Sequence, residues 1–396
     1  MPSQFAMHSQ VSMVEVATGL SLYTVELGNP DGAPMLFLHG GWGPIDNEEH
    51  RLDVLNDEIR SKFRIVYFHQ RGWGRSRIRG LLNPAGENIP TGVDTNIADC
   101  EVLRKHFNIE KWAVVYGGSN GAALGLAYAA KHFGSTISGL VLRGLWLIRE
   151  TDLDHNYGDG WNGKGKYYPV EWHKFVGHVG YTTRADLERL KKTKNPGLEL
   201  VNRYWELMTC HSPKKRQQAA ISWLKWDSLG ASVGIDNANS PAKGNHGEPN
   251  PAASNEFLTS DEDIVKLGLS FYRSLNSRES EINSKNFLEA AVARINGKTK
   301  SALAVQRRGD SVRSLPKKIR LITGEFDMLC PPLFAYELFE ALLGHGEDIG
   351  ERAKYEEPAR KKICQIIKGA SHTHYDPGMP DAVQKAMLGI AFGKDI

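Results

Sequence analysis

The chain has few cysteines, no long apolar run and no long run of like charges. It has four cysteines in 396 residues, and none forms a Cys-x-x-Cys pair: Cys100, Cys210, Cys330 and Cys364. A zinc site or a disulfide framework is therefore not expected. No stretch is long enough to span a membrane, and the N-terminus lacks a basic start followed by an apolar run. These absences predict a soluble, cytoplasmic protein without a secretory signal.

The charges are nearly balanced. Lys and Arg number 49 and Asp and Glu 46, which leaves a net charge of +3. A nucleic-acid-binding surface usually needs a larger basic excess gathered in one place. Nucleic acid and membrane are therefore not expected as partners, and the sequence leaves the oligomeric state open.

Short apolar runs alternate with helical patterns in two parts of the chain. The first part runs from about Leu22 to Leu147 and includes "MLFLHGG" and "FRIVYFHQRGWGRS". The second resumes with "KKIRLITGEFD" and "KKICQIIKGASH". This alternation predicts an α/β protein with a doubly wound, mostly parallel sheet that has helices on both faces.

Between these parts, residues 148–315 have mostly helical patterns, such as "PGLELVNRYWELMTC" and "RQQAAISWLKWDSL". Five tryptophans in this stretch could line a pocket or simply pack a small core: Trp161, Trp172, Trp205, Trp223 and Trp226. The segment "GASVGIDNANSPAKGNHGEPNPAASNEF" is rich in Gly, Pro, Asn and Ser, which predicts a long loop. We expect a helical cap domain over 148–315, inserted into an α/β domain made of 1–147 and 316–396.

A single serine, Ser119, lies in "VVYGGSNGAALGLAYAA", where a strand-like run passes directly into a helical pattern. Gly-x-Ser-x-Gly between a strand and a helix is typical of a nucleophile elbow, a sharp turn that exposes the serine Oγ. The motif alone is weak, because a glycine-rich turn with an N-capping serine has the same letters. The flanking strand and helix favour the nucleophile.

A serine hydroxyl needs a base and a group that orients the base. Asp327 follows the strand pattern of "RLITGEFD", and His372 follows that of "KICQIIKGASH". The order Ser119, Asp327, His372 is that of the α/β-hydrolase triad. Two alternatives stay open: Asp327 could only cap the next helix, and His374 could be the base. Asp376 is too close to His372 in sequence to be the natural third member.

Acyl chemistry also needs donors for the oxyanion. "HGG" ends the first core strand, where the α/β-hydrolase fold supplies one backbone N–H. The backbone N–H groups of Gly41 and of Asn120, which follows the nucleophile, are the expected pair. Each such donor typically contributes about 3 kcal/mol of transition-state stabilisation.

Six segments together resemble the proline iminopeptidase (prolyl aminopeptidase) branch of the α/β-hydrolases: "FLHGGWG", "FHQRGWGRS", "VVYGGSNGAALGLAYA", "LVLRGLWLIR", "GEFDMLC" and "GASHTHYDPG". The resemblance implies Ser119 as nucleophile, His372 as base and Asp327 as its orienting acid. It also implies a helical cap in which acidic residues bind the free α-amine of the substrate. The substrate-binding residues expected from it are Gly40, Trp42, Trp226, Asp227 and Phe271.

The chain departs from the family pattern in several places. Asn120 follows the nucleophile where the family usually has Trp, and His69 stands where the family has Asp. In the cap, the family's Trp-Glu corresponds to Trp226-Asp227, and an aromatic residue around Phe271 replaces the second amine-binding Glu. A buried ammonium needs charge compensation, so these changes weaken the case for a free N-terminal proline. Asp227 could also be a solvated residue at a helix end.

The sequence thus predicts a serine hydrolase that needs no cofactor or metal and acts on a small molecule or short peptide. It would release N-terminal proline or cleave a related small amide or ester through an acyl-enzyme. Two alternatives remain. One is a specialised small-molecule hydrolase or an acyl-transfer or C–C-cleaving enzyme that uses the same triad, and the other is a non-catalytic ligand-binding protein on this fold.

Overall fold

The computed structural model describes ten parts of the chain: 8–41, 52, 54–76, 92–147, 149–158, 160–231, 292, 295, 318–343 and 362–393. Within them, one eight-stranded sheet has the order β1-β2-β4-β3-β5-β6-β7-β8. β1 pairs antiparallel with β2 and β2 antiparallel with β4, and all later pairs from β4 to β8 are parallel. The predicted doubly wound, mostly parallel sheet is confirmed. The alternation of strands and helices did not predict the antiparallel hairpin at its edge.

The strands are β1 (His8–Ala17), β2 (Leu20–Gly28), β3 (Ala33–Leu38), β4 (Phe63–Phe68), β5 (Val114–Gly118), β6 (Leu140–Arg143), β7 (Ile319–Gly324) and β8 (Cys364–Ile367). Their side chains alternate between two cores. In β3, Leu36 and Leu38 face one core and Met35 and Phe37 the other. Because both faces are covered, the parallel strands are apolar nearly throughout.

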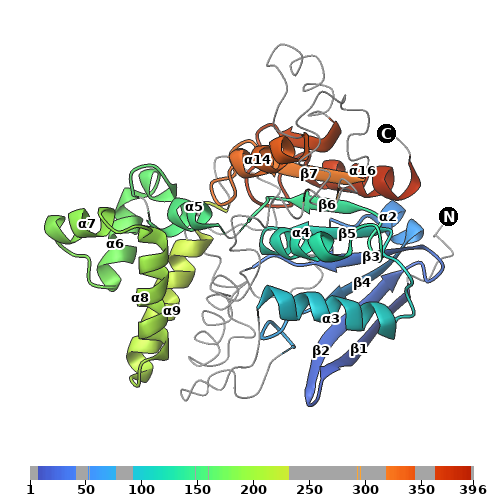
Figure 1. The fold of residues 1–396 in the computed structure, drawn as a ribbon, viewed down its shortest axis with the longest axis horizontal. Coiled ribbons are helices and arrows are strands. Elements are labelled where there is room, and N and C mark those ends of the chain that lie inside the picture. Colours follow the sequence, from blue (N-terminus) through green and yellow to red (C-terminus); the bar gives the residue numbers. More distant parts are fainter. Residues whose placement is uncertain are drawn as a thin grey trace, which may run out of the picture.

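Helices cover both faces of the sheet (Figure 1). α3 (Val93–His106), α4 (Asn120–His132) and α14 (Pro332–Leu343) contribute buried residues to the core that contains Leu36. α2 (Asp57–Lys62) and α16 (Met379–Phe392) contribute to the core that contains Phe37. This arrangement leaves the ends of the strands as the part of the sheet that a ligand can approach.

The described residues between β6 and β7 are helical and lie to one side of the sheet, in green and yellow-green in Figure 1. They form α5 (Glu150–Leu153), η1 (Asp154–Gly158), η2 (Lys164–Lys166), α6 (Pro169–His178), α7 (Arg184–Lys191), α8 (Pro196–Thr209) and α9 (Pro213–Ser228). The helical patterns predicted for α8 and α9 are confirmed. The predicted long loop lies almost wholly outside the described residues, and the boundaries of the cap stay a prediction.

The chain winds outward in two directions from β3. β4 lies on one side of β3 and β5 on the other, and β6, β7 and β8 follow β5 in turn. Ligands in such sheets bind beyond the carboxyl ends of the strands at the point where the winding reverses. His39, Ser119, Asp327 and His372 all follow the carboxyl ends of these strands. No helix among the described residues is long and apolar enough to cross a membrane.

Candidate active site

Ser119 lies at the sharp turn that the sequence predicted. β5 ends at Gly118 and α4 begins at Asn120, so Ser119 is the only residue between strand and helix. Its backbone has φ 55° and ψ −122°. A non-glycine residue with positive φ is strained and persists only where its surroundings hold it. Here the Ser119 N–H donates to the Arg143 carbonyl at 2.8 Å, and the Ser119 carbonyl accepts from Ala122 at 2.8 Å.

The neighbours of Ser119 are small because the turn brings backbone against backbone. A Cβ placed on Gly117 would overlap the carbonyl of Gly121. The end of β5 can therefore approach the first turn of α4 only where residue 117 is glycine, and a Cβ on Gly121 would overlap the carbonyl of Leu38. The glycines of the motif therefore hold the strained serine in position.

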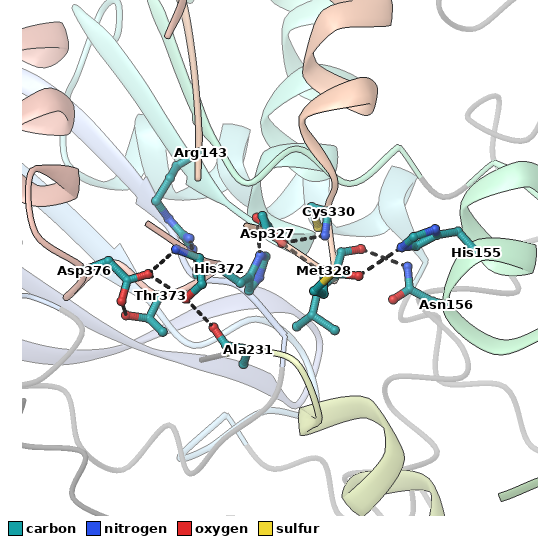
Figure 2. A network of polar contacts seen from close by, with 12 residues as sticks. Arg143, His155, Asn156, Ala231, Asp327, Met328, Cys330, His372, Thr373 and Asp376 are labelled. Carbon is teal, nitrogen blue, oxygen red and sulfur yellow. Dashed lines mark hydrogen bonds and ion pairs between the residues drawn. The ribbon is translucent and has the colours of Figure 1, made fainter. Parts of the chain in front are cut away.

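Asp327 and His372 form the pair that the sequence predicted, and both are buried, at 3% and 9% exposure. Asp327 Oδ2 lies 2.8 Å from His372 Nδ1 (Figure 2). The other carboxylate oxygen accepts from the backbone N–H groups of Leu329 at 3.0 Å and Cys330 at 2.7 Å. The tight turn after β7 thus fixes the carboxylate, and the carboxylate assigns the proton to Nδ1, which leaves His372 Nε2 as the basic atom.

The alternatives for these two positions lose support. α14 begins at Pro332, five residues beyond Asp327, so Asp327 does not cap that helix. Asp376 Oδ2 accepts from the N–H and the hydroxyl of Ser371, both at 2.6 Å. That carboxylate holds the loop that carries His372 in shape, and no bond joins it to the imidazole. Of the two candidate histidines, His372 is the one bonded to Asp327.

Cys330 links Ser119 to this pair. The Cys330 Sγ, a carboxylate oxygen of Asp327 and a ring nitrogen of His372 lie within 4.8 Å of one another, and all three residues are buried. Burial raises the pKa of the Cys330 thiol, the Asp327 carboxylate raises it further, and the nearby Ser119 hydroxyl lowers it. The thiol therefore lies beside the predicted nucleophile as well as the base. The 2.8 Å between Asp327 Oδ2 and His372 Nδ1 is a hydrogen-bond distance.

The loop after β3 passes beside the nucleophile. A Cβ on Gly40 would be 3.1 Å from Ser119 Cβ. His39 Nε2 accepts the Gln70 N–H at 3.0 Å, so Nδ1 carries the proton and donates to the Gly40 carbonyl at 2.7 Å. A neutral imidazole thus braces the loop that contains Gly41, one of the two expected oxyanion donors.

Asn120, whose N–H is the other expected donor, is the first residue of α4. The first N–H groups of a helix have no partner within it and favour negative charge. Trp42 and Phe271, two of the expected substrate-binding residues, lie outside the described residues.

Sequence reasoning missed two residues at the end of β6. Arg143 is buried and donates to the carbonyl of His372 (Figure 2). Gly144 has φ 54°, and a Cβ there would be 3.0 Å from His372 Cε1. A side chain at Gly144 would therefore crowd both the imidazole and the Asp327 carboxylate, 3.3 Å away. The segment "LVLRG" carries the signal, since a charged residue and a glycine directly follow a buried strand.

The two predicted cap residues, Trp226 and Asp227, are buried near the end of α9. The alternative that Asp227 is a solvated residue is wrong, since it is only 7% exposed. Tyr157 of η1 donates its hydroxyl to Asp227 Oδ1 at 2.6 Å. Burial raises the pKa of Asp227, while Lys164, Tyr157 and His372 lower it. Asp227 thus lies within electrostatic range of the predicted base.

Three tryptophans of the cap pack a core. Trp172, Trp223 and Trp226 are at most 2% exposed. Trp223 stacks on Tyr157 with ring centres 4.7 Å apart, and Trp226 stacks on Phe175 at 5.2 Å. The sequence left open whether the tryptophans line a pocket or pack a small core. These three pack the core of the cap.

Polar contacts join the cap to both loops of the predicted triad. His155 Nε2 bonds to the Met328 carbonyl and the Asn156 amide donates to the Leu329 carbonyl, each at 2.9 Å. The Ser371 hydroxyl, whose proton is shared with Asp376 Oδ2 at 2.6 Å, also approaches the Ala231 carbonyl at 3.1 Å. Figure 2 shows these contacts flanking Asp327 and His372. The cap is therefore fastened to the segments that carry the acid and the base.

A strained serine after a central strand, with its His–Asp partners after later strands of the same sheet, is the arrangement shared by the α/β hydrolases. Residues 33–353 match the profile of the alpha/beta hydrolase fold family. The chain belongs to this family.

The comparison with curated proteins gives a more specific resemblance than the fold family. The chain is 26% identical over 371 residues to the proline iminopeptidase of Xanthomonas citri. This match covers 94% of this chain and 93% of that protein. It is 35% identical over 207 residues to the proline iminopeptidase of Neisseria meningitidis serogroup A, and this match covers 52% of this chain and 58% of that protein. The resemblance to the proline iminopeptidases inferred from the motifs is confirmed.

Among solved structures, a haloalkane dehalogenase loop variant from Bradyrhizobium elkanii matches with a TM-score of 0.50. The sequence identity is 14%, and the match covers 97% of both chains. A likeness at this identity concerns the fold alone.

Proposed function

We propose that the chain is a serine hydrolase with Ser119 as nucleophile, His372 as general base and Asp327 as the residue that orients the base. Ser119 Oγ attacks an acyl carbonyl while His372 Nε2 takes its proton. The same imidazole then returns the proton to the leaving group, and water hydrolyses the acyl-enzyme. The backbone N–H groups of Gly41 and Asn120 stabilise the oxyanion.

The observation that carries this proposal is the strained backbone of Ser119 at the end of β5, beside a buried Asp327–His372 hydrogen bond. A residue with φ 55° costs folding free energy. A glycine-rich turn with an ordinary capping serine has no need of that strain. The side chain of Ser119 also makes no capping hydrogen bond to α4, so the alternative of a helix cap loses its basis.

The proposed substrates are small amides or esters, or short peptides. The relatives' name, proline iminopeptidase, makes N-terminal prolyl amides the first class to test, beside acyl groups of the same size. The proposal needs no cofactor, since the acyl transfer uses only a hydroxyl, an imidazole, a carboxylate and backbone donors.

A fluorophosphonate probe, which reacts with activated serines, tests the nucleophile directly. We expect one adduct, on Ser119, in the wild type. Ser119→Ala should remove the adduct and lower kcat by about 10⁶-fold while the thermal unfolding temperature stays nearly constant. Ser135→Ala, at an exposed turn serine, is the matched control and should keep both adduct and activity. Turnover near the wild-type rate in Ser119→Ala would overturn the mechanism.

A further inference from the structure

The cap contains a buried lysine that the proposed reaction does not use. Lys164 of η2 is 0% exposed. Its ammonium donates to the Trp226 carbonyl at 2.8 Å, lies 3.5 Å from the Asp227 carbonyl, and sits 4.5 Å from the centre of the Trp226 ring. Lysine is almost never fully buried unless its charge is compensated. The surroundings of Lys164 must therefore supply negative charge.

The Asp227 carboxylate acts on this ammonium electrostatically, without an ion pair closer than 4 Å, while the backbone carbonyl of the same residue lies 3.5 Å from it. Burial lowers the pKa of Lys164 to about 8, while Asp227 and then Cys330 raise it. The reciprocal effect is present, since Lys164 lowers the pKa of Asp227. Tyr157, at 1% exposure, adds the hydrogen bond to the Asp227 carboxylate. One buried carboxylate and one buried ammonium thus lie within electrostatic range of each other inside the cap.

The end of α9 and η1, which carry Asp227 and Tyr157, lie beside the loops of His372 and Asp327: the Ser371 hydroxyl oxygen is 3.1 Å from the Ala231 carbonyl, and Asn156 donates to the Leu329 carbonyl at 2.9 Å. The charge of His372 lowers the pKa of Asp227, and Cys330 raises the pKa of both Lys164 and Tyr157. Cys330 in turn lies within 4.8 Å of ligand atoms of Asp327 and His372. A substrate held at Ser119 therefore lies within electrostatic range of Lys164 and Asp227.

We propose that Lys164 is a specificity-determining residue: it provides from within the chain the cation that Asp227 requires, and so selects acyl groups without a free ammonium. This inference rests on the proposed function. A substrate ammonium would enter as a second cation beside a single carboxylate. In a buried site, where charges are poorly screened, two ammonium groups repel each other strongly. An uncharged acyl group of the same shape meets no such repulsion.

A purely structural role for Lys164 makes a different prediction. Trp226 and Asp227 lie in the last turn of α9, which ends at Ser228, and a cation there also stabilises the carbonyl end of the helix. Loss of that role would lower the unfolding temperature and would weaken activity towards all substrates alike. The discriminating measurement is therefore the ratio of activities towards charged and uncharged substrates.

A pair of substrates matched in shape isolates the charge. Prolyl p-nitroanilide carries a ring NH₂⁺ where cyclopentanecarbonyl p-nitroanilide has a CH₂ group. We expect wild-type kcat/KM to be at least about tenfold higher for the uncharged member. In Lys164→Met the ratio of kcat/KM, prolyl over uncharged, should rise by about 10- to 100-fold, because Asp227 becomes available to the substrate ammonium. Lys164→Met, Asp227→Asn should lose that rise.

Lys166→Met is the matched control, since Lys166 lies on the same short helix but is exposed. It should leave the ratio unchanged. An unchanged ratio in Lys164→Met, or a wild type that prefers the prolyl substrate, would overturn the inference.

A binding measurement tests this inference independently of the proposed reaction. In Ser119→Ala, which cannot turn over, cyclopentanecarboxamide should bind at least about tenfold more tightly than prolinamide by calorimetry, and Lys164→Met should reverse the order. This comparison needs only a folded protein with Lys164 in place, so it holds where Lys164→Met fails to fold. Equal binding of the two amides, or binding of neither, would remove Lys164 from the site whatever the reaction is.

Discussion

Two buried carboxylates, Asp327 and Asp227, interact with His372, and they are held in different ways. Asp327 follows a strand and is fixed by two backbone N–H groups within three residues and by His372. Asp227 ends a helix and is fixed by Tyr157, 70 residues away, and by the charge of Lys164. The first is a product of a local turn and the second of tertiary packing. We therefore expect Asp327 to act on the rate of every substrate and Asp227 to act on stability and on the choice of substrate.

The largest effect should come from Asp327→Asn. The amide can still accept the two backbone N–H groups through its oxygen, but its NH₂ then faces His372 Nδ1 and imposes the wrong tautomer. We expect kcat to fall by about 10⁴-fold for the prolyl and the uncharged anilide alike. Asp376→Asn, which alters only the loop after Ser371, should cost less than about tenfold. Similar losses in the two variants would make Asp376 a candidate for the third member of the triad.

Asp227→Asn should act mainly on stability. It leaves the Lys164 ammonium buried without its carboxylate, and removal of one partner of a buried pair costs about 3 kcal/mol or more. Urea unfolding would measure this loss. In the double variant with Lys164→Met the loss should be smaller than the sum of the single losses, because neither charge remains. Additive losses would mean that the two charges do not act as a pair.

The pH dependence of stability should reveal Lys164. Its pKa in the folded protein is about 8, against about 10.4 in an unfolded chain. Between these values the unfolded state binds more protons, so the free energy of unfolding should rise with pH, by about 2 kcal/mol between pH 8 and 9.5. Below pH 8 both states are protonated and this group contributes no slope. Subtraction of the profile of Lys164→Met isolates the effect, and parallel profiles would contradict it.

The smallest effect is expected from Tyr157→Phe. The change removes the hydroxyl that donates to Asp227 at 2.6 Å and keeps the ring that stacks on Trp223. The free energy of unfolding should fall by about 1.5–3 kcal/mol, the usual contribution of a hydrogen bond to a charged group. Tyr204→Phe is the matched control, since the Tyr204 hydroxyl donates to the Phe175 carbonyl elsewhere in the cap. Only Tyr157→Phe should also change the ratio of activities towards the matched anilides.

Most of the sheet was predictable because its signals are local. The parallel strands are short apolar runs, and the residues that follow β5, β7 and β8 are polar or glycine. Because Ser119 lies between Gly117 and Gly121, the sequence already implies a turn that is too tight for larger residues at those two positions. The edge hairpin of β1 and β2 was missed, since the alternation of strands and helices describes only the parallel part of the sheet.

The amino-acid sequence determined the sheet, the order of the three triad residues and the sharp turn at Ser119, because each depends on contacts between residues near in the chain or on the period of apolar side chains. Tertiary structure alone decided which charged side chains of the cap are buried. In "WNGKGKYY" Lys164 and Lys166 look alike, yet the first is buried against α9 and the second is exposed. Whether a lysine is buried depends on the packing of η1, η2 and α9, which lie up to 70 residues apart in the chain. That distinction decides which of the two lysines lies against the end of α9 beside Asp227.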